Sequence, residues 1–591
     1  DKKGVWVKTA HGDLNGVYYT YEIRHDDITE ETIDIYARTA GVNGAMGMVI
    51  DLEETNPAGW HNYHPEPLEH YTDAVIYEMH VRDFSIDKSG NFCYKGRFLA
   101  FVEKGVINAA GDKIGIDHLK ELGVTHVHLM PSFDYQTVDE TRLNVPQFNW
   151  GYDPQNFNCP EGSYSTNPYD GRARVAEFKR LVHALHCQGI RVIMDVVYNH
   201  TYATADSPFN KIFNKYYYRL WGENGEYFSN GSGCGNEIAT ERFMVRKYII
   251  DSLVYWATEY KIDGFRFDLM GLYDIETMNK IDETLHAINP DIILYGEGWI
   301  GGDSPLADSK RAMKLNARHT PNIAFFSDDF RDTIKGNNFE NRSRGYVNGA
   351  TGSEEYVKEV MCGRIPHPQI PNLTKFAWTL SPCQTVNYVE AHDNLTLWDK
   401  LIYTNPTDSL DTRKKMDKMA AACVFLAQGI PFIQAGQDFL RSKPLPGGAY
   451  DHNSYNSPDA VNSLKWDRKS EFRDVFDYYK GLIEFRKAHS ALRMFTAEDI
   501  GRNMKFFDHL PQRIVGFGLY GDCELKEIIV FFNPTNDDIT LHAFGEYNVY
   551  IDGDNAGNKP LYTVCDDYII KPHSTMVMGR PYPQPEEEAA E

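Results

Sequence analysis

The chain has 591 residues, of which 42% are hydrophobic and 24% charged, and this composition is typical of a globular protein. Its net charge of −24 excludes nucleic acid and anionic membrane surfaces as main partners, because both bind through clusters of Lys and Arg. The apolar run 419–436 is interrupted by two Gln and a Pro, so it predicts a buried helix followed by a strand and not a membrane span.

The first 65 residues are predicted to be β-rich, with strands over 4–10, 16–24 and 32–39 separated by turn-rich spacers. This segment is short for a complete β-sandwich domain. The following stretch, 57–71, carries three His but lacks the short, regular ligand spacing of a metal site, so we interpret it as a linker.

From residue 74 to 439, apolar strand-like runs alternate with amphipathic helical stretches, which is typical of a parallel sheet. The predicted strands are 74–81, 124–131, 190–198, 262–270, 291–299, 323–330, 385–393 and 429–439. Eight such strands predict an α/β fold, a closed (β/α)₈ TIM barrel over residues 66–494, with long loop insertions after the second, third and sixth strands. An open doubly wound sheet is the alternative, but no GxGxxG follows the first strand.

After residue 495 the helical period disappears, and residues 495–580 predict an antiparallel β-sandwich. The tail 581–591 is charged and poor in hydrophobic residues, so we expect it to be disordered. The predicted domains are therefore a β-rich segment over 1–65, the barrel over 66–494 and the sandwich over 495–580.

Polar residues gather at the predicted carboxyl ends of the barrel strands, where barrel enzymes place their working groups. They are Asp195, Asn199 and His200 after strand three, Arg266 and Asp268 on strand four, Glu297 after strand five, and His392 and Asp393 at the end of strand seven. Each has a purely structural alternative, such as a helix cap for Asp195, a core salt bridge for Asp268 or a turn for Asp393. A cluster of like charges that served structure alone would only lower stability, so the combination indicates a catalytic site.

Paired carboxylates of this kind suit glycosidic bond cleavage, in which one group stays ionised and the other donates a proton. Arg266 lies two residues from Asp268 on the same strand face and would hold that carboxylate charged. Glu297 sits between two Gly and a Trp in YGEGW, a less polar setting that would favour its protonated form.

Four motifs, DVVYNH (195–200), GFRFDLMG (264–271), YGEGW (295–299) and VEAHDN (389–394), resemble the four sequence regions of the α-amylase superfamily, glycoside hydrolase family 13, in their usual order. The resemblance implies that Asp268 is the nucleophile, Glu297 the general acid/base and Asp393 a stabiliser that grips the distorted sugar. It also implies roles for four neighbouring side chains. Arg266, His200 and His392 would form hydrogen bonds in the −1 subsite, and Asp195 would support the site.

The stretch FNWGYDP (148–154) is similar to the YNWGYDP signature of type I pullulanases, which cut α-1,6 bonds in pullulan, starch, glycogen and limit dextrins with retention of configuration. This match implies that Tyr152 stacks under the −1 glucose and that Asp153 orients nearby groups. Trp299, beside the predicted acid, supplies a further ring for substrate contact. The departure from the signature is Phe148, which lacks the hydroxyl of the usual Tyr. SYNSPDAVNSLKWD (454–467) also resembles this family.

Two further resemblances concern the N-terminal segment and a metal. HGDLNGVYYTYEI (11–23) resembles the last part of a family 48 carbohydrate-binding module, whose first half is absent here, so independent glycan binding is not expected. No cofactor is required, but many amylase-like barrels bind a structural Ca²⁺ near the Asn of the first region, for which Asn199 is the candidate ligand. The expected partner is an α-glucan chain, and we expect a monomer.

Nine scattered Cys without a CxxC pair fit free thiols in a reducing compartment, and DKKGVWVK at the N-terminus is not a signal peptide. Both features favour a cytoplasmic protein. The absence of a starting Met indicates a trimmed chain, which leaves secretion open.

Three other functions remain open. The first is another enzyme of the superfamily (an isoamylase, a branching enzyme or a neopullulanase-like amylase), against which FNWGYDP argues. The second is a non-catalytic glycan-binding or scaffold protein, which predicts loss of a catalytic carboxylate. The third is a metal-dependent hydrolase built on His392 and Asp393, which predicts further His/Asp pairs at the barrel mouth.

Overall fold

The computed structural model describes residues 7–25, 27–63, 65–371, 373, 377–521 and 523–582, and gives the backbone alone for 543 and 544. The predicted disordered tail therefore lies outside the described residues from 583 onward, as do the first residues of the strand predicted at 4–10.

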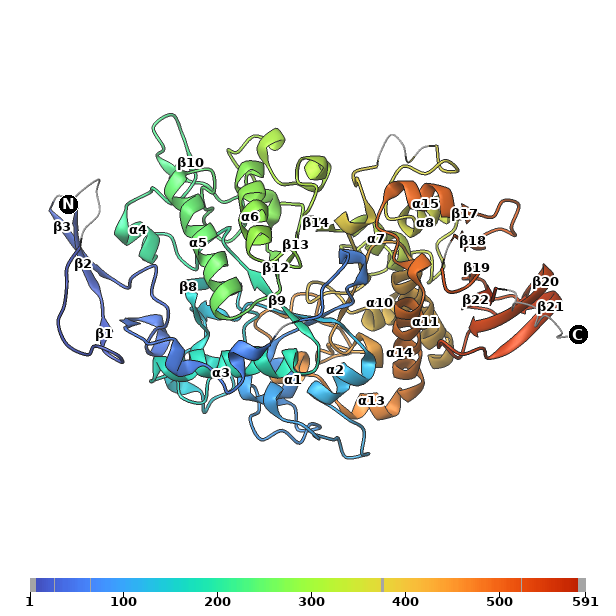
Figure 1. Ribbon diagram of the computed structural model, residues 1–591, viewed down its shortest axis with the longest axis horizontal. Helices are drawn as coiled ribbons and strands as arrows, with labels where there is room; N and C mark the ends of the chain where they lie inside the picture. The colour runs from blue at the N-terminus through green and yellow to red at the C-terminus, as the bar shows by residue number, and fades with distance from the viewer. Residues whose placement is uncertain are drawn as a thin grey trace, which may run out of the picture.

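Eight parallel strands close into a barrel at the centre of the molecule (Figure 1). They are β5 (Ile76–Met79), β6 (His126–Leu129), β9 (Arg191–Val196), β12 (Gly264–Phe267), β13 (Ile293–Gly296), β14 (Ala324–Phe326), β15 (Thr385–Asn387) and β16 (Ile430–Gln434). Each lies within its predicted run, so the predicted TIM barrel is confirmed.

Alternate residues of these strands build two separate cores, as the period of two requires. Inward-facing side chains such as Ile193, Tyr295 and Phe432 fill the barrel, and outward-facing ones such as Tyr77 and Phe265 pack in the layer shared with the helices. Polar side chains on inward positions are consequently surrounded by apolar ones.

The helices cover the barrel from outside and follow the strands in alternation (Figure 1). They are α1 (Val81–Ile86), α2 (Ile116–Leu122), α3 (Gly171–His186), α4 (Pro208–Ile212), α5 (Phe243–Glu259), α6 (Ile275–Ile288), α7 (Asp328–Lys335), α8 (Glu354–Met361), α10 (Leu397–Thr404), α11 (Leu410–Leu426), α12 (Asp459–Asn462), α13 (Asp467–Glu471), α14 (Arg473–Ala488) and α15 (Ala497–Asn503). Side-chain caps define several starts, for example Asp274 at α6. The apolar run 419–436 forms the end of α11 and then β16, as predicted. Among the helices of the described ranges, none has the length and apolarity needed to cross a membrane.

Long insertions follow the second, third and sixth barrel strands, as expected. The first contains the hairpin of β7 (Phe133–Tyr135) and β8 (Pro154–Pro160) and the FNWGYDP loop between them. The second contains α4 and the hairpin of β10 (Leu220–Trp221) and β11 (Tyr227–Phe228). The third contains α7 and α8.

The N-terminal segment forms two small antiparallel ladders, of which β2 and β3 lie at one end of the long axis (Figure 1). Its strands are β1 (Tyr18–Tyr19), β2 (Tyr21–His25), β3 (Ile28–Thr32) and β4 (Gly47–Met48). The strand predicted over 32–39 is wrong, because β3 ends where it should begin. The Asp34 carboxylate accepts the backbone N–H of Tyr36 at 2.8 Å, and this local turn competes with strand pairing.

The C-terminal strands confirm an antiparallel β-rich segment, at the opposite end from β2 and β3 (Figure 1). They are β17 (Met504–Phe506), β18 (Val515–Tyr520), β19 (Glu527–Asn533), β20 (Ile539–Ile551), β21 (Tyr562–Ile570) and β22 (Ser574–Arg580). In the described residues they are joined as one sheet in the order β17-β18-β19-β22-β20-β21, where a sandwich has two sheets. Irregular pairing twice along β20 bends that strand, so one sheet can curve around its own apolar face. The exact domain boundaries stay predictions.

A buried arginine ties the second-strand insertion to α3. Arg174 is fully buried, and its guanidinium lies 3.0 Å from Asp134 Oδ1 and 2.9 Å from Glu140 Oε2. Glu140 also accepts the backbone N–H of Asn43 at 2.7 Å, which attaches the N-terminal segment to the same cluster. Burial raises the pKa of Asp134 to about 7, because these carboxylates have left water.

Arg174→Ala should therefore lower the free energy of unfolding by about 3–5 kcal/mol, since it leaves buried carboxylates without their cation. Urea unfolding followed by Trp fluorescence measures the change. Arg172→Ala is the matched control two residues earlier, because Arg172 is exposed and bonded to the exposed Asp170. Equal effects of the two changes would contradict the account.

Candidate active site

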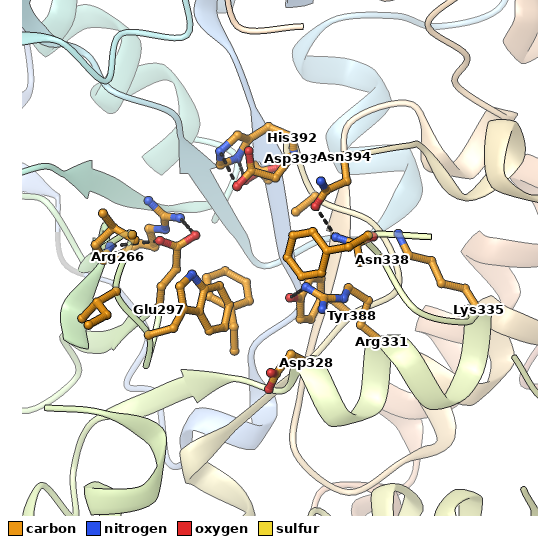
Figure 2. Close-up of a pocket in the computed structure, with 18 residues that line it drawn as sticks. Arg266, Glu297, Asp328, Arg331, Lys335, Asn338, Tyr388, His392, Asp393 and Asn394 are labelled. Atoms are coloured by element: carbon orange, nitrogen blue, oxygen red, sulfur yellow. Dashed lines mark hydrogen bonds and ion pairs between the residues drawn. The ribbon is translucent and has the colours of Figure 1, made fainter. Parts of the chain in front are cut away.

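A cavity of about 480 Å³ opens at the carboxyl ends of the barrel strands. Arg266, Glu297, His392 and Asp393 lie along one part of its wall (Figure 2). The remaining wall carries residues that the sequence analysis did not single out: Asp328, Arg331, Lys335, Asn338, Phe339, Tyr388 and Asn394. With Trp299, which also lines it, the cavity thus joins five of the predicted site residues, which lie on or after three different strands.

The guanidinium of Arg266 links three carboxylates. It lies 3.0 Å from Asp195 Oδ1, 3.0 Å from Asp268 Oδ1 and 2.6 Å from Glu297 Oε1. Burial works against the charge of Arg266, but Asp195 and Glu297 outweigh it and hold its pKa well above the ordinary value. Arg266 is therefore shared by the whole cluster and is not the partner of Asp268 alone, as the sequence analysis had it.

Asp268 follows the last residue of β12 and is held from two sides. Its Oδ1 accepts from Arg266, and its Oδ2 accepts from Asn199 Nδ2 at 2.7 Å. Burial raises the pKa of Asp268, and the Arg266 charge opposes this rise. The hydrogen bond from Asn199 opposes this rise as well, so both contacts favour the ionised form of the Asp268 carboxyl.

Glu297 follows β13, and its carboxyl favours the protonated form. Burial raises the pKa of Glu297 to about 8, and the charges of Asp268 and Asp393 add to this rise while Arg266 opposes it. This supports the protonated form predicted for Glu297, but the reason differs from the less polar setting that the sequence suggested. Glu297 contacts the Arg266 guanidinium, so burial and the neighbouring carboxylates are what raise its pKa. Leu269 donates its backbone N–H to Glu297 Oε2 at 2.9 Å from a left-handed conformation (φ 40°), which costs roughly 1–2 kcal/mol outside glycine.

Gly296 explains part of the YGEGW motif. A Cβ at this position would lie 2.5 Å from the carbonyl oxygen of Phe267 and 2.9 Å from Met270. Only glycine lets β13 approach β12 this closely, and the two catalytic candidates stand directly after these strands.

His392 and Asp393 follow β15 in the VEAHDN motif. The Asp393 carboxylate is 55% exposed on the cavity wall, 3.9 Å from His392 Nε2, so it is accessible to a ligand. His392 is buried, and its Nδ1 lies 2.7 Å from Glu78 Oε1 on β5.

Tyr152, in the FNWGYDP loop, packs into the same cluster. Its hydroxyl donates to Asp195 Oδ2 at 2.8 Å, and its ring lies 5.0 Å from the His392 ring at an angle of 23°. Asp195 also pairs with His128 Nε2 at 3.0 Å. Burial would raise the pKa of Asp195, but Arg266 and His128 outweigh it and lower that pKa, in keeping with the predicted supporting role.

Two predicted substrate-binding residues are engaged elsewhere. The His200 ring nitrogens lie 2.5 Å from Asn199 Oδ1 and 2.8 Å from the Tyr152 carbonyl oxygen, so protein groups use both. Asp153 accepts the backbone N–H of Thr137 at 2.7 Å, which braces the loop. Direct substrate contact by either residue stays a prediction. Trp299 lies on the cavity wall, as a substrate-binding ring should.

The contacts of Asn199 do not fit the role of Ca²⁺ ligand that was suggested for it. Its amide nitrogen donates to Asp268, and its oxygen is 2.5 Å from His200 Nδ1, so both ends serve the active site. In the described part of the chain, one group of acids is close enough together for a metal, namely Asp134, Glu140 and Glu161, and two of them are already paired with Arg174.

Comparisons with known proteins agree with this geometry. Residues 92–216 match the family model described as alpha amylase, catalytic domain. A curated pullulanase from Bacillus subtilis (strain 168) is 40% identical, with 91% of this chain and 73% of that protein covered. The pullulanase structure from Bacillus acidopullulyticus superposes with a TM-score of 0.90 at 43% identity, covering 96% of this chain and 68% of that one.

The chain belongs to the pullulanase family of the α-amylase superfamily. A pullulanase mutant from Paenibacillus barengoltzii, solved in complex with maltotetraose, superposes with a TM-score of 0.92 at 42% identity, covering 98% of this chain and 88% of that one. The predicted resemblance to type I pullulanases is confirmed, and the other superfamily enzymes are no longer needed to explain the motifs.

Glu78 is a wall residue that the sequence analysis missed. Its signal was present in the sequence, because AVIYEMHV places a carboxylate in an otherwise apolar strand, as GFRFDLMG does with Arg266. Arg331 and Lys335, on α7, were also missed. They belong to the insertion after the sixth barrel strand, and the alternation of residues along the strands does not predict where that insertion lies.

The Glu297 carboxyl should keep its proton up to pH about 8, because ionisation would place a further charge in a buried acidic cluster. Infrared difference spectroscopy between the unchanged protein and Glu297→Gln should show a protonated carboxyl band at pH 6 that disappears near pH 8. Loss of that band below pH 6 would contradict the assignment.

Proposed function

We propose that this pullulanase-family chain is a debranching hydrolase that cleaves α-1,6-glucosidic bonds of pullulan and branched α-glucans by a retaining double displacement. One observation carries the proposal: a single guanidinium, that of Arg266, is bonded to an ionisable carboxylate and to a carboxyl whose pKa is raised to about 8, beside an open cavity. This asymmetry supplies a nucleophile and a proton donor in one place.

In the first step, an oxygen of ionised Asp268 attacks the anomeric carbon of the −1 glucose. The bond from that carbon to the glycosidic oxygen breaks, and Glu297 transfers its proton to the departing oxygen. The sugar is then an ester of Asp268. The Arg266 charge remains beside the cluster while negative charge moves from Asp268 to Glu297.

In the second step, Glu297 is ionised and accepts a proton from a water molecule, whose oxygen attacks the anomeric carbon. The ester bond to Asp268 breaks, and both carboxyl groups return to their starting states. Two inversions at one carbon give net retention, which requires the two carboxyl groups to be roughly 5–5.5 Å apart.

The groups around the pair would hold the sugar. The exposed carboxylate of Asp393 accepts hydrogen bonds from sugar hydroxyls, and His392 Nε2 lies 3.9 Å from that carboxylate on the same wall. The Tyr152 ring, packed against His392, offers an apolar surface of the kind that pyranose rings stack on.

The α-1,6 preference is supported by the FNWGYDP loop and by Trp299 on the cavity wall. Trp150 of that loop packs edge-on against His392, with ring centroids 4.8 Å apart, so the loop is part of the −1 wall. Rings from this loop and from the loop after β13 therefore shape the approach of a branched chain.

The two remaining alternatives lack support in the site. A non-catalytic scaffold predicts loss of a carboxylate, whereas Asp268, Glu297 and Asp393 are all present. A metal-dependent hydrolase needs free ligand atoms around His392, but its Nδ1 is paired with Glu78.

Asp268→Asn and Glu297→Gln should each lower kcat by several orders of magnitude with little change in KM, since both groups act in the transition state. Maltotriosyl fluoride separates the roles, because fluoride leaves without a proton. In the first turnover, Glu297→Gln should release fluoride at close to the unchanged rate and then accumulate the glycosyl ester, because the second step still needs Glu297 as a base, whereas Asp268→Asn should release no such burst of fluoride.

Asp438→Asn is the control for these changes, because Asp438 is buried beside His118 at 3.3 Å outside the cavity wall. It should change stability and leave kcat per folded molecule unchanged. Equal fluoride release by both catalytic variants, or an inverted product by NMR, would refute the roles.

Pullulan should be cut to maltotriose and amylose should remain nearly untouched. Tyr152→Ala should abolish most activity by removing the ring against His392, whereas Phe148→Tyr should be tolerated, because it restores the usual signature. Product analysis by chromatography tests the set. Panose from pullulan, or faster hydrolysis of amylose, would contradict the linkage assignment.

A further inference from the structure

Glu78 is a buried carboxylate that the mechanism above does not use. It lies on β5, is 1% exposed, and reaches the cavity wall from the inside of the barrel. None of the four superfamily motifs contains it. An ionised carboxylate in such a place is costly unless it is paired and hydrogen-bonded.

Both oxygens of Glu78 contact the same residue. Oε1 lies 2.7 Å from His392 Nδ1, and Oε2 accepts the backbone N–H of His392 at 2.7 Å. One contact fixes the ring and the other fixes the backbone just before Asp393. This two-point contact joins the first barrel strand to the loop after the seventh.

We infer that Glu78 is a positioning residue of the reaction, which fixes the rotation of His392 and keeps its ring protonated so that Nε2 presents a proton to the −1 sugar. With Glu78 on Nδ1, the ring's other nitrogen is directed to the side of Asp393, at 3.9 Å. The inference rests on the proposed function, because it gives Glu78 a role in how His392 contacts the −1 sugar.

Packing fixes the ring from its faces as well. Tyr152 lies nearly parallel to it, with centroids 5.0 Å apart, and Trp150 meets it edge-on at 4.8 Å. Rotation of the ring would therefore break the Glu78 contact and both aromatic contacts together. The arrangement resembles other sites in which a carboxylate sets the tautomer and orientation of a working imidazole.

Charged and titratable groups from several elements surround this pair. They are His128 on β6, Asp195 on β9, Arg266 and Asp268 at β12, Tyr295 and Glu297 at β13, Glu390 and Asp393 in the loop after β15, Arg441 and Lys443 after β16, and Tyr152 in the loop after β6.

The net effect on His392 is positive charge at neutral pH. Burial alone would lower the pKa of His392, but the Glu78 and Asp393 carboxylates outweigh it and raise that pKa to about 9. Burial would likewise raise the pKa of Glu78, but the His392 charge lowers it. Without Glu78, burial should leave the imidazole neutral at pH 7.

The test is Glu78→Gln, which keeps the shape and removes the charge. In protein labelled with ¹⁵N-histidine, the His392 signal, assigned from His392→Ala, should report a protonated ring at pH 7 in the unchanged protein and a neutral ring in the variant. The His118 signal should not move, since its carboxylate partner is Asp438. On pullulan, kcat should fall roughly 10- to 100-fold with little change in KM.

A double-mutant cycle separates positioning from a general loss of structure. If Glu78 acts through His392, then Glu78→Gln in a His392→Ala background should change kcat by less than about 2-fold. Glu78→Asp, which keeps the charge, should keep His392 protonated and restore part of kcat even if Glu78→Gln folds poorly.

A His392 signal that stays protonated in Glu78→Gln, or additive losses in the double mutant, would overturn the inference. Fluoride release by Asp268→Asn would instead refute the proposed function, so the two failures are distinguishable.

Discussion

The shared guanidinium of Arg266 is the interaction on which the site depends. Three buried carboxylates within 3.0 Å of one cation would repel one another strongly without it, and the barrel mouth could not hold them together. Because Arg266 cannot neutralise all three, burial and the charges of Asp268 and Asp393 raise the pKa of Glu297 to about 8, and in the proposed mechanism the proton stays on that carboxyl. The proposed division into nucleophile and acid thus depends on one positive charge that three carboxylates share.

Barrel geometry explains why these groups meet. Arg266 on β12 pairs in register with Asp195 on β9, and Glu78 on β5 pairs with His128 on β6, so all four side chains point inward at neighbouring positions. The surrounding interior is apolar, which strengthens each charge–charge contact. The loops after these strands then add the exposed carboxylate of Asp393.

Much of this could be predicted from sequence, because the strand period and the order of the motifs depend on local residues alone. The eight strands and the cluster around Asp268 and Glu297 are examples. What could not be predicted depends on closure of the barrel or on local competition. The inward direction of Glu78 is defined only once β5 lies between β16 and β6, and the strand expected over 32–39 is lost to the turn at Asp34.

The central claim is that Asp268, held by Arg266 beside a protonated Glu297, forms the covalent bond to the sugar. Trapping with a fluorinated maltotriosyl fluoride, which slows both steps, followed by peptide mass spectrometry, tests it most directly. The account predicts one added glycosyl group, located on Asp268 within GFRFDLMG. An adduct on another carboxylate such as Asp393, or turnover of the reagent with no covalent intermediate and an inverted product, would contradict it.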